Sequence, residues 1–216
     1  MDLELQEIAV VFFPKDNIRK DIVLQVYDTL KQSKKFTINN FSINTDVINS
    51  PIEIFPFPLL SFNVESWQCA FRRNRIDCQI KLKATDIISE NIFAPLISIF
   101  NEFSDDITIN RLGFVAKYIF KGNISNIRNH FLKEEFCKEE FALMALVFAN
   151  KITNANVSFY DNIQISDNDK IVIRDINTGN LPNNLTLKIL QDMCKEAVNL
   201  FSKPAIETIV YGTISK

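Results

Sequence analysis

The residue types best suited to chemistry gather in one short stretch of this sequence, WQCAFRRNRIDCQIKL, residues 67–82. Cys69 and Cys78 could bind a metal ion or form a redox pair. The three arginines, Arg72, Arg73 and Arg75, could bind phosphate or carboxylate groups. An ordinary β-hairpin with a basic turn would have the same composition, so the spacing of the apolar residues has to decide.

A two-residue turn at Arg73-Asn74 places the apolar residues of both arms on one face, where Cys69 lies opposite Cys78. The remaining residues form a polar face. Two arms that agree on both faces in one register predict a hairpin, and Asn74 tolerates the left-handed conformation that such a turn needs. We therefore expect two buried free thiols rather than a metal site, because further ligands are missing.

Arg72 and Arg75 then lie opposite each other on the solvent side, with Arg73 at the tip. Like charges in this position destabilise a strand pair, so we expect the arginines to have a role that offsets this cost. Three interpretations stay open: a solvated basic turn that keeps the sheet soluble, a salt bridge to an acidic residue such as Glu102 or Asp105, or binding of nucleic acid or an acidic partner. The candidate binding residues are Arg72, Arg73, Arg75, Lys81, Lys83 and Arg111.

Other motifs of catalysis or cofactor binding are missing from the sequence. The four glycines are scattered, so there is no phosphate-binding loop, and there is no GxSxG motif. His130 is the only histidine and cannot form a two-histidine metal site. Asp175 is the best isolated carboxylate, and we interpret it as a turn or helix-capping group. We predict no catalytic residues, no cofactor, no metal and no enzymatic activity.

Composition and charge indicate a globular cytoplasmic protein. The chain has 216 residues, 47% of them hydrophobic, and a net charge of −2, which argues against a surface devoted entirely to nucleic acid. The N-terminus is acidic where a signal peptide needs positive residues, and the longest apolar run, Phe141 to Ala149, is too short to cross a membrane. The 19 phenylalanines fit an AT-rich coding bias. The four cysteines include no CxxC pair, so we expect reduced thiols. Because neither a signal peptide nor a spanning segment is predicted, we expect no membrane partner.

The first half of the chain predicts the order β-α-β-β-β-α. Residues 7–13 are apolar at both odd and even positions, which predicts a strand buried on two faces. Asp16 can cap a helix that extends to about Gln32. A strand over 36–44, a proline-rich loop or edge segment over 49–58 and two strands from about Leu60 precede a helix over 86–103.

The second half starts in the same way, with a strictly alternating strand over 107–120 and a helical stripe over 122–132. Residues 141–152 are ambiguous between helix and strand, and a strand there would repeat the order of the first half. A hairpin around 167–169 and a helix from about Asn184, interrupted near Ser202, complete the chain. We expect an α+β protein, a single compact unit over 1–216, with pseudo-repeats 1–104 and 105–216 that share a mainly antiparallel sheet packed on helices.

Four motifs follow one another along the chain: the RRNR hairpin, the strand RLGFVAKYIF, the strand IRDIN and the closing helix NLFSKPAIETI. This ordered set resembles a sporadically distributed family of uncharacterised bacterial proteins. Asp175-Ile176-Asn177 replaces an acidic D-I-D in that pattern, and the usual histidine of the closing helix is absent. The resemblance implies an accessory gene, such as one of a defence or toxin-linked system, and it carries over no catalytic residue.

These observations favour a non-enzymatic intracellular binding or regulatory module that acts through a protein partner or by self-association, in an accessory or defence-type bacterial system. The alternative is a nucleic-acid-binding accessory protein that uses the basic hairpin from Arg72 to Arg75. The two differ in salt dependence, because nucleic-acid binding weakens steeply as salt increases.

Overall fold

The computed structural model describes residues 2–33, 35, 37–45, 57–83, 88–121, 146–154, 157–166 and 170–211. The elements of the first half are β1 (Asp2–Pro14), α1 (Lys20–Gln32), β2 (Ile38–Ile43), β3 (Leu60–Val64), β4 (Trp67–Phe71), β5 (Ile76–Lys81), the 3₁₀ turn η1 (Glu90–Phe93) and α3 (Ala94–Phe103). Those of the second half are β6 (Ile109–Lys121), β7 (Leu146–Asn154), β8 (Val157–Ser166), β9 (Ile171–Asn177), α5 (Leu187–Leu200) and α6 (Lys203–Tyr211).

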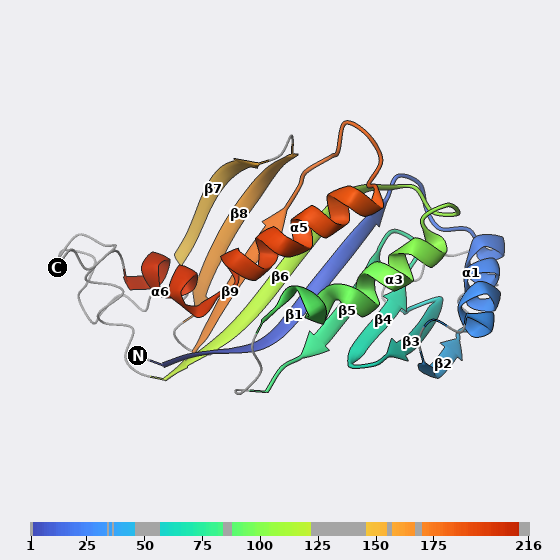
Figure 1. Ribbon diagram of the computed structural model, residues 1–216, viewed down its shortest axis with the longest axis horizontal. Coiled ribbons are helices and arrows are strands. Elements are labelled where there is room, and N and C mark those ends of the chain that lie inside the picture. The colour runs from blue at the N-terminus through green and yellow to red at the C-terminus, as the bar shows by residue number, and fades with distance from the viewer. Residues whose placement is uncertain are drawn as a thin grey trace.

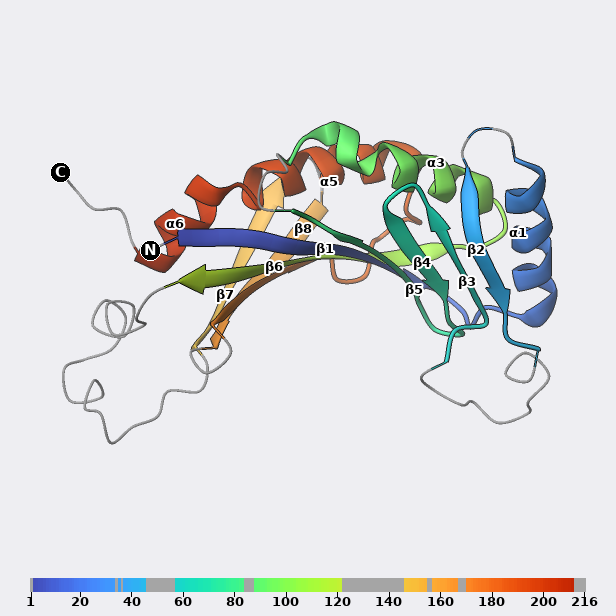
Figure 2. The same cartoon turned by 90° about the horizontal axis from the view of Figure 1, so that it is seen from below.

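Within this part of the chain, the strands form one nine-stranded sheet in the order β2-β3-β4-β5-β1-β6-β9-β8-β7. All of the strand pairs are antiparallel. Figure 1 shows α3 and α5 lying across this sheet, and Figure 2 shows that they lie on the same face of it, with α6 beyond the end of α5. The predicted α+β class is confirmed.

β1 and β6 lie at the centre of the sheet and pair along almost their whole length, from Asp2 with Lys121 to Pro14 with Ile109. From β1 the sheet continues through β5, β4, β3 and β2, and from β6 it continues through β9, β8 and β7. On both sides the last strand of each half lies next to the first, and the preceding strands follow as a meander. The interpretation of the halves as pseudo-repeats stays a prediction.

The segment from Leu60 to Phe71 forms two strands, so the first half has one strand more than the sequence predicted. Glu65 adopts a left-handed conformation, with φ 51°, in the turn between β3 and β4. Buried positions have even numbers in β3 and odd numbers in β4. This change of parity marks the reversal of the chain, although Glu65 is not a typical turn residue.

Two further expectations for the first half are wrong. β1 is not buried on two faces, because Ile8, Val10 and Phe12 are buried beneath the helices whereas the residues between them are only half-buried on the opposite face. Asp16 does not cap a helix, because α1 begins at Lys20, four residues later, and has no side-chain cap. Alternation thus separates a helix-covered face from a partly accessible one even in the central strand.

The second half agrees with the sequence where it is described. The ambiguous segment is a strand from Leu146 onward, because it pairs with β8 along its whole length. The β8–β9 hairpin is confirmed, and so is the interruption at Ser202 between α5 and α6. Three predictions lie outside the described residues: the helix over 122–132 with His130, residues 141–145, and the proline-rich segment up to residue 56.

β2, at one end of the sheet, is irregular. Its register with β3 shifts between Asn39 and Ser42, and Asn40 is left-handed, with φ 54°. Within this bulge, the Phe41 ring packs edge-on against Tyr27 of α1, with 5.0 Å between the ring centroids. The bulge therefore turns an aromatic side chain toward the helix at the expense of regular strand pairing.

Aromatic side chains join α3 to the sheet. The Phe100 ring stacks on that of Phe12 with centroids 5.6 Å apart, and the Phe103 ring meets Phe12 edge-on at 5.9 Å. The indole N–H of Trp67 donates to the Ile92 carbonyl at 2.8 Å, so the buried polar atom of this large side chain has a partner. Each such buried side chain contributes about 1.5–3 kcal/mol to folding.

A buried ion pair joins the end of α5 to the sheet. Nε and Nη2 of Arg174 donate to the two carboxylate oxygens of Asp161 at 2.9 and 2.7 Å, and Nη1 donates to the Leu200 carbonyl. The Tyr118 hydroxyl donates to the Phe201 carbonyl at 2.8 Å. Carbonyls at the end of a helix have no partner within the helix, and here side chains of the sheet supply the missing donors.

Replacing Arg174 with methionine should lower the free energy of unfolding by about 3–5 kcal/mol, because the Asp161 carboxylate stays buried without its partner. The double variant Asp161→Leu/Arg174→Met removes both charges and should recover much of this loss. The control is Lys188→Ala, which breaks the exposed pair with Asp192 and should change the free energy by less than about 0.5 kcal/mol. Urea unfolding measures all three, and an Arg174→Met variant as stable as the control would contradict the prediction.

Candidate binding face

The sheet face opposite the helices carries no helix in the described part of the chain (Figure 2). We call it the open face. Successive side chains of a strand point to opposite faces, so the residues that alternate with the buried ones belong to it. On the three central strands they are Glu4, Glu7, Ala9, Val11 and Phe13 of β1, Arg111, Gly113, Val115, Lys117 and Ile119 of β6, and Ile171, Ile173, Asp175 and Asn177 of β9.

The hairpin predicted for residues 67–82 is confirmed in its register, with Cys69 opposite Cys78 on the helix-covered face. Both thiols are buried and free. Burial raises the pKa of the Cys78 thiol, and the neighbouring Cys69 raises it further. A thiol in this environment stays protonated, which makes it a poor nucleophile and a poor metal ligand.

The turn of this hairpin differs from the predicted one, because Asn74 does not adopt a positive φ. The Arg72 N–H donates to the Arg75 carbonyl at 2.8 Å, and the Ile18 N–H donates to the Arg73 carbonyl at 2.6 Å. A contact with the segment that leads into α1 therefore holds the tip, in place of a left-handed turn residue.

Arg72 and Arg75 share one carboxylate oxygen on the open face. Their Nε atoms lie 2.7 and 3.1 Å from Oδ2 of Asp77. The salt-bridge partner is thus Asp77 of the same hairpin and not Glu102 or Asp105. Asp77 offsets the repulsion of the opposed arginines, yet Nη1 of Arg72 is buried with no hydrogen-bond acceptor among the described residues.

A hollow of about 600 Å³ lies on the open face beside this cluster. The two glutamines that line it are hydrogen-bonded to each other, because Nε2 of Gln79 donates to Oε1 of Gln68 at 3.0 Å. Small apolar side chains and polar, uncharged ones line it, which favours an occupant with both apolar groups and hydrogen-bonding groups. Apart from the charged cluster, the side chains that carry this character are Ala9, Val11, Asn40, Ser61, Asn63, Gln68, Ala70 and Gln79.

A second charged site of the open face lies across β1 from the hairpin. The guanidinium carbon of Arg111 is 3.8 Å from the centroid of the Phe13 ring, and the buried Nε of Arg111 has no acceptor among the described residues. Burial is the largest influence on the pKa of Asp175 and raises it above its ordinary value. The Asn177 hydrogen bond and the positive charge of Arg111 lower this pKa, and the negative charge of Asp161 raises it. Asp175 lies within β9, so its predicted turn or capping role is wrong.

The structure brings only some of the candidate residues together. Arg72 and Arg75 meet at Asp77, and Arg111 points to the same face two strands away. Lys81 lies farther along β5, opposite Glu7 of β1. Lys83 follows the end of β5, and Arg73 occupies the tip of the turn, so these two are not part of the cluster.

Asp77 was not among the salt-bridge partners predicted for the arginines from the sequence. A signal for it was present, because Asp77 follows Arg75 by two residues and therefore shares its face of the strand. In the predicted register it is also a diagonal cross-strand neighbour of Arg72. A search for salt-bridge partners within the hairpin would have found it.

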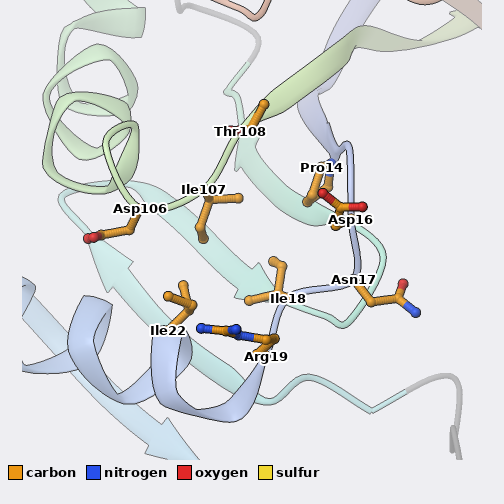
Figure 3. A pocket seen from close by; sticks show the side chains of 9 residues that line it. All are labelled: Pro14, Asp16, Asn17, Ile18, Arg19, Ile22, Asp106, Ile107 and Thr108. Atoms are coloured by element: carbon orange, nitrogen blue, oxygen red, sulfur yellow. The ribbon is translucent and has the colours of Figure 1, made fainter.

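A second hollow, of about 400 Å³, lies where β1 leads into α1, and Figure 3 shows its side chains. Ile18, Ile22 and Ile107 form its apolar part, with Asp16 and Asp106 on opposite sides of them. Asp106 accepts a hydrogen bond from Gln25 at 2.7 Å. The lining thus joins structural elements and presents no converging set of reactive groups.

Comparison with known proteins leaves the family open. No family model matches this chain, and no curated protein matches it either. The resemblance to the sporadically distributed bacterial family therefore stays a prediction. Among the described residues, no three His, Cys, Asp or Glu side chains gather as a metal site requires, and no helix has the length and apolar character needed to span a membrane.

The raised pKa of Asp175 predicts that Asp175→Asn stabilises the protein at pH 7. A carboxyl whose pKa is higher in the folded than in the unfolded state destabilises the fold when it is ionised in both. The gain should shrink as the pH falls through the folded pKa toward the ordinary value of 3.8. Urea unfolding of both proteins across this pH range measures it. A variant that is less stable at pH 7 would show instead that attraction to Arg111 outweighs burial.

Proposed function

We propose that this protein is a non-enzymatic cytoplasmic binding module that acts through a protein partner, and that the partner binds the open face. The supporting observation is the set of apolar side chains on a sheet face that no described helix covers. Val11, Val115 and Ile173 are half-buried, and Ile119 has 37% of its surface exposed. Apolar groups clustered on an accessible face are typical of protein interaction sites.

The partner needs two kinds of group to match this face. Apolar side chains would cover the centre, formed by β1, β6 and β9, and hydrogen-bonding groups would enter the hollow beside Gln68 and Gln79. Charged groups also lie on this face: Lys81 lies opposite Glu7 of β1, and Lys117 lies within β6 itself. A protein interface combines apolar contacts with polar and charged groups. A regulatory role in an accessory or defence-type bacterial system belongs to the same proposal.

A charge placed at Ile119 should abolish partner binding. Ile119→Lys puts a cation in the centre of the interface, where it cannot be solvated, whereas Leu24→Lys makes the same change at a side chain of α1 with 38% exposure. We expect the wild type and Leu24→Lys to capture the same protein from a native-host lysate, identified by mass spectrometry. Ile119→Lys should not capture it. Capture that is equal for all three proteins, or absent at native expression levels, would contradict the proposal.

Nucleic-acid binding is the second candidate, and the observation in its favour is that Arg72, Arg75 and Arg111 lie on one accessible face. Asp77 and Asp175 lie on the same face and repel a phosphate backbone. These carboxylates offset part of the positive charge of the arginines, which is the reason for placing this candidate second.

A salt titration with labelled DNA and RNA tests the second candidate. If the protein binds nucleic acid, log K should fall linearly with log salt concentration, with a slope of roughly −0.9 for each phosphate contacted on duplex DNA. Charge reversal of Arg73 and Arg75 should then abolish binding. We expect no such binding at low salt, and a steep slope that disappears in the charge-reversed variant would favour nucleic acid over a protein partner.

A further inference from the structure

The chain satisfies its arginines in two different ways. In the core, Arg174 uses Nε, Nη1 and Nη2, all in hydrogen bonds to Asp161 and Leu200. On the open face, Arg72 donates from Nε to Asp77, and its buried Nη1 has no acceptor among the residues that the structure describes. A buried donor without a partner costs free energy, so this guanidinium would gain from an additional acceptor.

The Arg72–Asp77–Arg75 cluster carries one surplus positive charge, because two guanidinium groups share one carboxylate. Both contacts use Nε, so the edge formed by Nη1 and Nη2 is not the one that binds Asp77. That edge matches the two oxygens of a carboxylate group. An incoming carboxylate can therefore add at the Nη1–Nη2 edge of Arg75, whose side chain is 47% exposed, without displacing Asp77, and Arg72 supplies the surplus positive charge.

Arg111 repeats this arrangement across β1. Its guanidinium lies on the Phe13 ring at 3.8 Å, which fixes its plane, and its Nε has no acceptor within the described part of the chain. Phe12 pairs with Ile76 and Phe13 pairs with Arg111, so Arg75, Phe13 and Arg111 follow one another across three neighbouring strands. Two strand spacings separate Arg75 from Arg111 by roughly 10 Å.

We propose that these two sites bind two carboxylate groups, roughly 10 Å apart, on an acidic segment of the protein partner. Small side chains and amides line the hollow beside the first site, so it can hold the main chain and short side chains of an extended peptide. Asp77 and Asp175 oppose a continuous run of phosphates but tolerate two separate anions. This inference names the chemistry of the partner and rests on the function proposed above.

A peptide with the sequence Gly-Glu-Pro-Pro-Glu-Gly, blocked at both ends and fluorescently labelled, is a suitable probe. Its prolines favour the polyproline II conformation, which holds the two glutamates on one side and roughly 9 Å apart. The matched probe replaces both glutamates with glutamine. Fluorescence anisotropy measures affinity, and amide shifts of the ¹⁵N-labelled protein locate the bound peptide.

We expect the glutamate peptide to bind and to shift the amides of β4, β5 and the start of β6, and the glutamine peptide not to bind. Arg75→Gln and Arg111→Gln should each weaken binding about tenfold, the loss expected for a hydrogen bond between charged groups. Arg72→Gln should weaken it as well, because it removes the surplus positive charge of the cluster. Arg19→Gln is the control, because it removes an arginine from an exposed pair with Asp21 and changes the net charge equally. Thermal unfolding confirms that each variant is folded.

Equal binding of the two peptides, or an equal loss with Arg19→Gln, would overturn the inference. An oligonucleotide that binds more tightly than the glutamate peptide, with the same dependence on Arg75, would assign the sites to nucleic acid. If the native partner is lost with Ile119→Lys but retained with both Arg75→Gln and Arg111→Gln, the proposed function stands and the carboxylate sites are refuted. If neither the probe nor the native partner depends on these arginines, the inference fails as well.

Discussion

The pairing of β1 with β6 is the constraint on which the rest of the structure depends. These two strands of 13 residues come from different halves of the chain and form the middle of one continuous sheet. Because they are antiparallel and nearly in full register, they determine which side chains of all the outer strands lie beneath α3 and α5. A slip of β1 by one residue against β6 would move Phe12 from the core to the open face.

The division of the sheet into two faces explains where binding is possible. Rings such as Phe12, Phe100 and Phe103 interlock on the helix-covered face, and the one charged pair described there, Asp161 with Arg174, has its hydrogen bonds satisfied. The open face has partly exposed apolar groups and guanidinium donors that have no acceptors among the described residues. Incomplete satisfaction of polar groups is costly in a folded protein, which is why the proposed partner is placed on this face.

Much of this arrangement can be predicted from the sequence, because alternation and register are local properties. The hairpin with Cys69 opposite Cys78 follows from apolar spacing alone, and so does the strand that contains Arg111. The reversal at Glu65 was missed because its residue types do not indicate a turn, although the parity of buried positions changes there. The approach of Arg111 to Asp175 depends on the pairing of β6 with β9, which no local pattern specifies. The phenylalanines, attributed to coding bias, turn out to supply much of the core.

The bulge in β2 has a consequence for assembly. A strand at the end of a sheet can recruit another chain only if its backbone offers a regular row of donors and acceptors. The left-handed Asn40 and the register shift after Asn39 interrupt that row. The described sheet therefore offers at most one regular edge, that of β7, to another copy of itself. Pairing through a single edge forms a closed pair and does not by itself extend into a fibre, since each addition uses up that edge.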